Sequence, residues 1–143
     1  MAKLKILTFP DPRLRKVAAP VTKFNKSLET TTSDMLETMY AEDGIGLAAS
    51  QVDIHERIIV MDISEERNEP KIFINPEFRV LSDKSLLSFT EGCLSVPGVT
   101  EDITRPDNIY LTWQDIKGAS HEAEPSGLLT VCIQHEIDHL EGK

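Results

Sequence analysis

Two histidines and a glutamate near the C-terminus have the spacing that most clearly supports chemistry. His135, Glu136 and His139 form the pattern H-E-x-x-H. On a helix, residues four apart lie on one face, so both imidazoles can reach one metal ion. The glutamate beside them can hold and deprotonate a water molecule. The pattern predicts a hydrolytic metal site, and the alternative is a pair of surface histidines on an amphipathic helix.

A catalytic site of this kind usually has three protein ligands and an open position. The candidates for the third ligand are the carboxylates and four side chains, Cys93, Cys132, His55 and His121. Cys132 is too close to His135 along the helix to complete a tetrahedron easily, so we interpret it as a small buried residue lining the site. For Cys93, the spacing alone fits a ligand and a core cysteine equally well.

The segment 44–51, GIGLAASQ, contains two glycines and two alanines that would let another group approach the backbone closely. It lacks the lysine–serine/threonine ending of a phosphate loop and the spacing G-x-G-x-x-G. By itself, a tight turn that leads into a packed strand is the simpler interpretation.

The elements that must position these residues can be predicted from periodicity. A helical pattern covers 25–41 and ends at Asp43-Gly44. The segment 57–63 is apolar and β-branched, which predicts a buried strand, and a strand at 72–74 would end at Asn75-Pro76. Alternation at 108–114, a turn at 115–118 and a strand at 120–124 predict a hairpin.

The histidines lie on a predicted helix over 127–140, with an N-cap at Ser126 and a stop at Gly142. One stripe of this helix would combine apolar residues with both histidines, and a second stripe would be apolar. The residues expected on the opposite, solvent side are Thr130, Gln134, Asp138 and Glu141.

One helix, several strands and a late helix predict an α+β fold, with mainly antiparallel strands packed around a central metal-binding helix. A length of 143 residues without a composition break fits a single domain over 1–143. The net charge of −9 argues against general nucleic-acid binding. No secretory signal or membrane-spanning run is visible, so we expect a cytoplasmic protein.

Three segments together resemble the peptide deformylases. That family is marked, in this order, by G-φ-G-φ-A-A-x-Q, E-G-C-φ-S and Q-H-E-φ-D-H, where φ is apolar. These motifs stand here without a mismatch at 44–51, 91–95 and 134–139. The resemblance covers essentially the whole chain and is closest to the bacterial type.

The resemblance implies a hydrolase that removes the N-formyl group from the N-formylmethionyl ends of newly made polypeptides and releases formate. It implies one divalent metal ion, natively Fe(II), with Zn(II), Ni(II) or Co(II) as possible substitutes. The ligands would be Cys93, His135 and His139. Glu136 would be the general acid and base, and Gln51 and the backbone N–H of Leu94 would hold the oxyanion.

By the same resemblance, Gly46 and Glu91 shape or bind the substrate region. The pocket for the methionine side chain would be lined by Ile45, Leu128, Val131 and Cys132. The implied partners are nascent N-formylmethionyl polypeptides, without nucleic acid or membrane, and a monomer is expected. Members usually continue beyond the metal helix into a tail linked to ribosome docking, so residues 1–143 alone do not predict that association.

The chain departs from the family pattern at 98–102, which is acidic where relatives often carry a basic residue.

The sequence leaves two other functions open. One is an H-E-x-x-H peptidase that cuts internal peptide bonds. The other is a structural zinc site with Cys132 or His121 as a fourth ligand.

Overall fold

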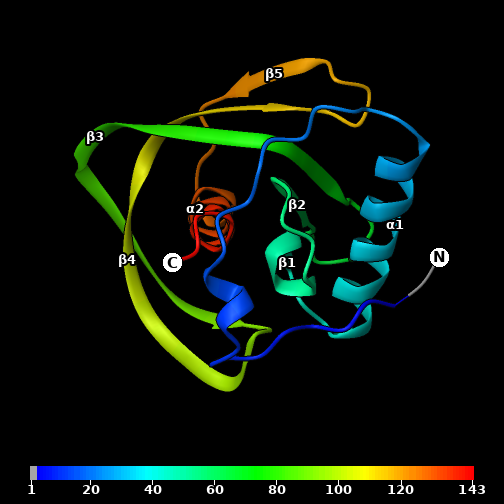
Figure 1. Ribbon diagram of the computed structural model, residues 1–143. Helices are drawn as coiled ribbons and strands as arrows, with labels where there is room; N and C mark the ends of the chain where they lie inside the picture. The colour runs from blue at the N-terminus through cyan, green and yellow to red at the C-terminus, as the bar shows by residue number, and fades with distance from the viewer. Residues whose placement is uncertain (1–2) are drawn as a thin grey trace.

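The computed structural model describes residues 3–143, apart from the side chains of 83–85, 87–92 and 96–103. In the described residues, one antiparallel sheet of order β1-β2-β3-β4-β5 combines with two α-helices and two short 3-10 helices (Figure 1). This confirms the predicted α+β class. The elements are η1 (Pro12–Arg15), α1 (Lys26–Ala41), β1 (Gly46–Ala48), η2 (Ala49–Val52), β2 (Ile58–Met61), β3 (Lys71–Cys93), β4 (Val96–Gln114), β5 (Ser120–Ala123) and α2 (Leu128–Leu140).

Helix α1 forms where its sequence pattern predicts it. The Asn25 side chain caps the helix by accepting a hydrogen bond from the Leu28 N–H at 3.2 Å. The helix ends at Ala41, and Asp43 then takes a left-handed conformation with φ 55°. One face of α1 is buried, at helical spacing: Leu28, Thr32, Met35, Thr38 and Met39.

Strand β2 is fully buried because both of its faces are covered. Its side chains alternate between the faces of the sheet, as in any strand. Ile59 and Met61 pack in the cluster that includes Ile133 and Ile137 of α2. Ile58 and Val60 pack in the cluster that includes residues of α1. This two-sided burial explains why the segment is continuously apolar instead of alternating.

The hairpin of β3 and β4 is much longer than the sequence predicts. The prediction that Asn75-Pro76 ends a strand at 72–74 is wrong, because β3 continues through this dipeptide to Cys93. The pairing register shifts between Ile74 and Glu77, where Asn75 has a φ of 51°. Asn75-Pro76 therefore forms an irregularity within the strand. There the Asn75 side chain accepts a hydrogen bond from the Val21 N–H at 2.7 Å and donates one to the Val21 carbonyl at 3.0 Å.

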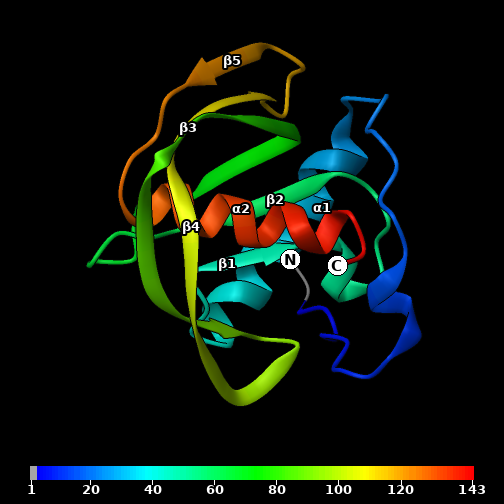
Figure 2. The ribbon, with the colours of Figure 1, turned by 90° about the vertical axis from the view of Figure 1, so that its left-hand side faces the viewer.

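The long hairpin curves around α2. Figure 1 looks nearly along α2 and shows β3 and β4 bending around it, and Figure 2 shows α2 crossing behind β4. Two of the positions predicted to face solvent are consequently buried: Thr130 is 0% exposed and Gln134 is 3% exposed. The Gln134 side chain donates a hydrogen bond to the carbonyl of Pro106 in β4 at 2.7 Å. The prediction was wrong at these two positions, and at Gln134 the reason is that β4 packs against what would be the solvent side of the helix.

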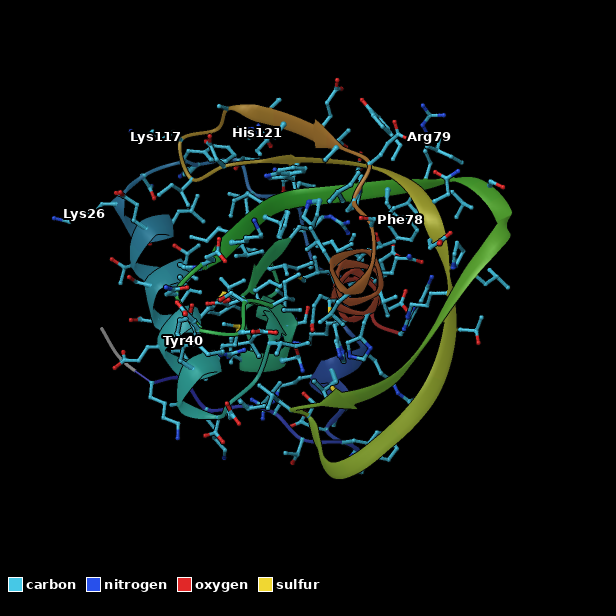
Figure 3. The ribbon with its side chains drawn as sticks, turned by 180° about the vertical axis from the view of Figure 1, so that it is seen from behind. Lys26, Tyr40, Phe78, Arg79, Lys117 and His121 are labelled. Carbon is cyan, nitrogen blue, oxygen red and sulfur yellow. The ribbon has the colours of Figure 1, made fainter. Side chains whose placement is uncertain are left out.

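The ends of α2 are defined by glycines. Gly127, not Ser126, occupies the N-cap position, with φ 64°, and Gly142 follows the last turn with φ 78°. Strand β5 forms the edge of the sheet, where His121 stacks on Trp113 with ring centroids 5.5 Å apart (Figure 3). None of the helices described in 3–143 is long and apolar enough to cross a membrane.

Candidate metal centre and active site

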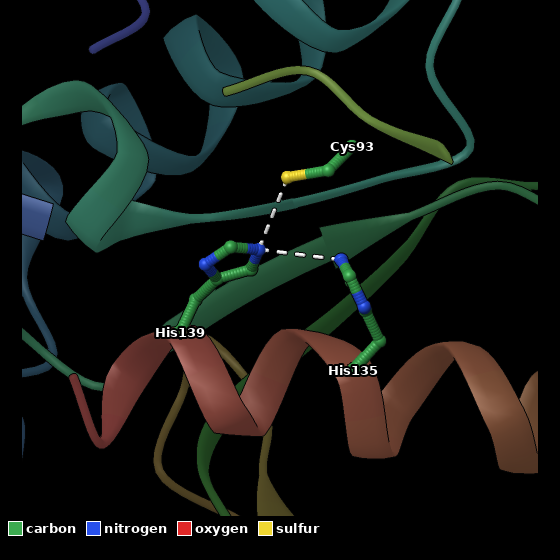
Figure 4. A group of neighbouring side chains, drawn as sticks. All are labelled: Cys93, His135 and His139. Atoms are coloured by element: carbon green, nitrogen blue, oxygen red, sulfur yellow. Dashed lines mark hydrogen bonds between the residues drawn. The ribbon is translucent and has the colours of Figure 1, made fainter. Parts of the chain in front are cut away.

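His135 and His139 approach each other on one face of α2. Their Nε2 atoms are 3.2 Å apart, and their rings meet edge to face at an interplanar angle of 83° (Figure 4). Helix periodicity alone produces this pairing, because the two residues are one turn apart.

Cys93 reaches the same point from the end of β3. Its Sγ lies 3.3 Å from the His139 Nε2, although the two residues are 46 positions apart in the sequence (Figure 4). The three ligand atoms of Cys93, His135 and His139 all lie within 4.8 Å of one another. Among the residues whose side chains are described, this is the group of His, Cys, Asp and Glu that could hold a metal ion.

The other candidates for a third ligand lie elsewhere. His121 is on the edge strand β5 and bonds to Asp115 at 2.9 Å, and His55 bonds to Asp53 at 2.8 Å. Cys132 packs against the core cluster of α2. Neither cysteine forms a disulfide.

The donor set fits a divalent metal ion. Burial and the neighbouring His135 lower the pKa of His139 to about 4, so its imidazole is neutral at neutral pH. Neutral imidazole nitrogen and thiolate sulfur are ligands for zinc and iron. The Asp138 carboxylate, next to His139 in the sequence, is paired with Arg105 at 3.0 Å.

Glu136 is buried beside the cluster, at 6% exposed. Strand β1 passes so close to it that a Cβ on Gly46 would lie 2.7 Å from the Glu136 Oε2. A side chain at position 46 would therefore have to displace this carboxylate.

Gln51 lies in η2 and is 2% exposed. Its Oε1 accepts a hydrogen bond from the Ala48 N–H at 2.9 Å. Its Nε2 lies 3.0 Å from the Ser95 Oγ and 3.5 Å from the Cys93 Sγ. The structure thus brings the amide group of Gln51 to the edge of the cluster, with its donor nitrogen toward Cys93.

The remaining residues of the predicted site differ in how far they are exposed. Leu94 follows Cys93, and its side chain would be 2.7 Å from a Cβ on Gly44. Ile45 is 39% exposed and Leu128 is 36% exposed, whereas Val131 is 0% exposed. The side chain of Glu91 and those of the acidic stretch 98–102 lie outside the described residues.

Sequence reasoning gave no role to Ser95, although it is the last residue of the motif E-G-C-φ-S. Ser95 is 1% exposed and accepts a hydrogen bond from the Gln51 amide. The signal available in the sequence was its position two residues after the candidate ligand Cys93.

Comparisons with known proteins agree with this geometry. The family model "Polypeptide deformylase" matches residues 3–143. A peptide deformylase of Hahella chejuensis is 55% identical over 100% of this chain and 84% of the relative, and one of Pseudomonas aeruginosa is 52% identical with the same coverage. The crystal structure of the Thermotoga maritima peptide deformylase superposes with a TM-score of 0.93 at 43% identity, covering 99% of this chain and 94% of that one.

The fold and the cluster of a thiol and two imidazoles define a metal-dependent hydrolase of the α+β class. The chain belongs to the polypeptide deformylase family, whose members remove the formyl group from N-formylmethionine peptides. This membership removes the two other functions considered from the sequence, an internal peptidase and a purely structural zinc site.

Proposed function

We propose that Cys93, His135 and His139 hold the single divalent metal ion of this deformylase, natively Fe(II). The observation that carries the proposal is the convergence of the Cys93 Sγ and the two imidazoles within 4.8 Å, beside the buried Glu136. Zn(II), Ni(II) and Co(II) suit the same nitrogen and sulfur ligands, so they could replace iron. When bound, such an ion lowers the pKa of a coordinated water to roughly 7 and so supplies a nucleophile at neutral pH.

Glu136 is proposed to move the proton of the reaction. Its carboxylate accepts a proton from the attacking water and returns it to the amine as the C–N bond of the formamide breaks. The products are formate and a peptide with a free methionyl amine. Support comes from its place on α2 between the two histidines, and from its burial at 6% exposure, which keeps the carboxylate out of bulk water.

The formyl oxygen gains negative charge during the reaction, and the Gln51 amide and the Leu94 N–H are proposed to stabilise it. The Gln51 Nε2 is a donor held 3.5 Å from the Cys93 Sγ. Removing one such donor from an enzyme typically costs about 2.7–4 kcal/mol of transition-state stabilisation.

The methionine side chain is proposed to lie against α2 and the start of β1. Leu128, Val131 and Cys132 are three and four residues apart, so they share the side of α2 that continues to His135. Ile45 and Leu128 are large apolar residues with exposed surface, as expected for residues that a ligand covers. Gly46 and Glu91 complete the proposed substrate site.

Residues 1–143 are proposed to form one catalytic domain that acts as a monomer on nascent N-formylmethionyl polypeptides. We expect it to work in the cytoplasm, with no membrane or nucleic acid as a direct partner.

The test is anaerobic purification followed by metal analysis and measurement of formate release from formyl-Met-Ala-Ser. One metal per chain and stoichiometric formate are expected, with iron as the metal in the most active preparation. Casein is the control substrate, and internal fragments without formate would contradict the proposal.

A further inference from the structure

Ser95 is a buried residue outside the proposed catalytic set, and its side chain contacts the Gln51 amide of that set directly. We propose that Ser95 is a positioning residue, whose hydroxyl fixes the Gln51 amide so that its second N–H points toward the reacting formyl group. The inference rests on the proposed role of Gln51 as an oxyanion donor. It assigns a function to a serine that otherwise only forms part of the turn between β3 and β4.

The orientation of the Gln51 amide follows from its partners. The Ala48 N–H lies 2.9 Å from Oε1, and a backbone N–H only donates. If the amide were flipped, its NH2 group would meet this N–H, and two donors would face each other in a buried site. The nitrogen must therefore lie on the side of Ser95 and Cys93.

The Ser95 hydroxyl then determines where the two hydrogens on the Gln51 Nε2 point. Its Oγ lies 3.0 Å from the Gln51 Nε2 and accepts one of them. The other hydrogen points to the side of the Cys93 Sγ, which is 3.5 Å away. The terminal torsion of a glutamine is broad, so without the hydroxyl the amide plane is held only by the Ala48 contact and the longer contact to the Cys93 Sγ.

The backbones of both residues are held independently of this side-chain contact. The Leu7 N–H donates to the Gln51 carbonyl at 2.7 Å, and the Phe9 N–H donates to the Ser95 carbonyl at 2.8 Å. The N-terminal segment thus connects η2 to the turn after β3. Replacing the serine hydroxyl should leave the backbone in place and change only the amide.

Ser50 provides a matched control. It lies in the same 3-10 helix as Gln51 and is 0% exposed. Its hydroxyl oxygen has no hydrogen-bond partner among the described residues. Ser50→Ala therefore removes a buried hydroxyl one residue from Gln51 without touching the amide.

The experiment measures formate release from formyl-Met-Ala-Ser by S95A, S50A, Q51A and the double variant S95A/Q51A. We expect S95A to lower kcat by about tenfold to a hundredfold, because a misaligned donor loses part of a stabilisation made in the transition state. KM should stay within about twofold, as should kcat of S50A. In the Q51A background, S95A should cost less than about twofold, since residues that act through one another are not additive. S95T, which keeps the hydroxyl, should lie nearer the wild type than S95A.

A second readout does not depend on activity. In 15N-labelled, metal-free protein, the two side-chain amide hydrogens of Gln51, assigned by their loss in Q51A, should be well separated in wild type and S50A. In S95A they should move together. The inference is overturned if these resonances do not change, if S95A keeps its kcat, or if S95A costs as much without Gln51 as with it. A wild-type chain that releases no formate, or a fully active Q51A, would instead remove the proposed function of Gln51, and the inference with it.

Discussion

Gly46 lies against Glu136 so closely that a Cβ on this glycine would be 2.7 Å from the carboxylate oxygen Oε2. The contact joins strand β1 to the middle of α2 and sets where the proposed acid and base can sit. A catalytic consequence is expected from this packing, because the nearest atom belongs to the carboxylate that is proposed to exchange the proton.

Gly46→Ala should therefore lower kcat much more than it lowers stability. The added methyl group displaces the Glu136 carboxylate by about an ångström, and misplacements of that size can cost about a hundredfold. Formate release and thermal unfolding measured on the same preparation check this. Gly44→Ala is the comparison, since its Cβ would lie 2.7 Å from the Leu94 Cδ1 and would not meet the Glu136 carboxylate. Equal losses in the two variants would contradict the explanation.

Glu136→Gln should keep the metal and lose turnover. The amide has the shape of the carboxylate but cannot accept the proton, and general acid–base catalysis typically contributes 10²–10⁴-fold, so a loss of about that size is expected. The measurement combines metal content with single-turnover formate release. A variant that lost its metal would indicate that Glu136 supports the ligands and not the proton transfer.

Cys93→Ala should lose most of the bound metal, because it removes one of the three converging donors. Cys132→Ala is the matched control for metal content, since Cys132 is on the same helix as the histidines but outside the cluster. Metal analysis after dialysis against a weak chelator should separate the two variants by at least about tenfold. Comparable metal loss from Cys132→Ala would show that this cysteine contributes to the site.

The buried Asp62 should make stability fall in acid. Burial opposes its ionisation, but hydrogen bonds from Ser64, Tyr40 and the Glu69 N–H outweigh it and lower the pKa of Asp62 to about 2. Because the pKa of Asp62 is lower in the folded protein than in the unfolded chain, its ionised carboxylate stabilises the fold above about pH 4. This stability is lost as the pH falls toward 2. Denaturant unfolding between pH 2 and pH 5 measures this loss.

Tyr40→Phe should reduce that dependence. Tyr40, on the outer helix α1 (Figure 3), donates to the Asp62 Oδ2 at 2.6 Å, and burial followed by this bond raises the pKa of Tyr40 to about 12. The variant should unfold a few degrees lower at pH 7. Because folding raises the pKa of Tyr40, its protonated phenol stabilises the wild type below about pH 10, and this stability is lost as the pH rises to about 12. The variant should lack this contribution. An unchanged acid limb would mean that Ser64 and the loop backbone alone hold the carboxylate.

The sequence alone was enough to predict those parts of the molecule that depend on local periodicity. The pairing of His135 and His139 needs only a helix, and α1 forms where the helical pattern at 25–41 predicts it. The apolar run at 57–63 indicated a buried strand, which β2 confirms. The family motifs added the function, because three short segments in order are far more specific than H-E-x-x-H alone.

Tertiary structure decided what lies around those local elements. The long hairpin brings Cys93 next to His139, although the two residues are 46 positions apart in the sequence. A pattern within a short segment cannot predict a contact between residues so far apart. The same hairpin buries Gln134, whose polar side chain finds a carbonyl in β4 instead of water. A helical wheel assumes that one face of a helix is exposed to solvent. In α2, polar positions on that face are buried because strands that are remote in the sequence enclose the helix.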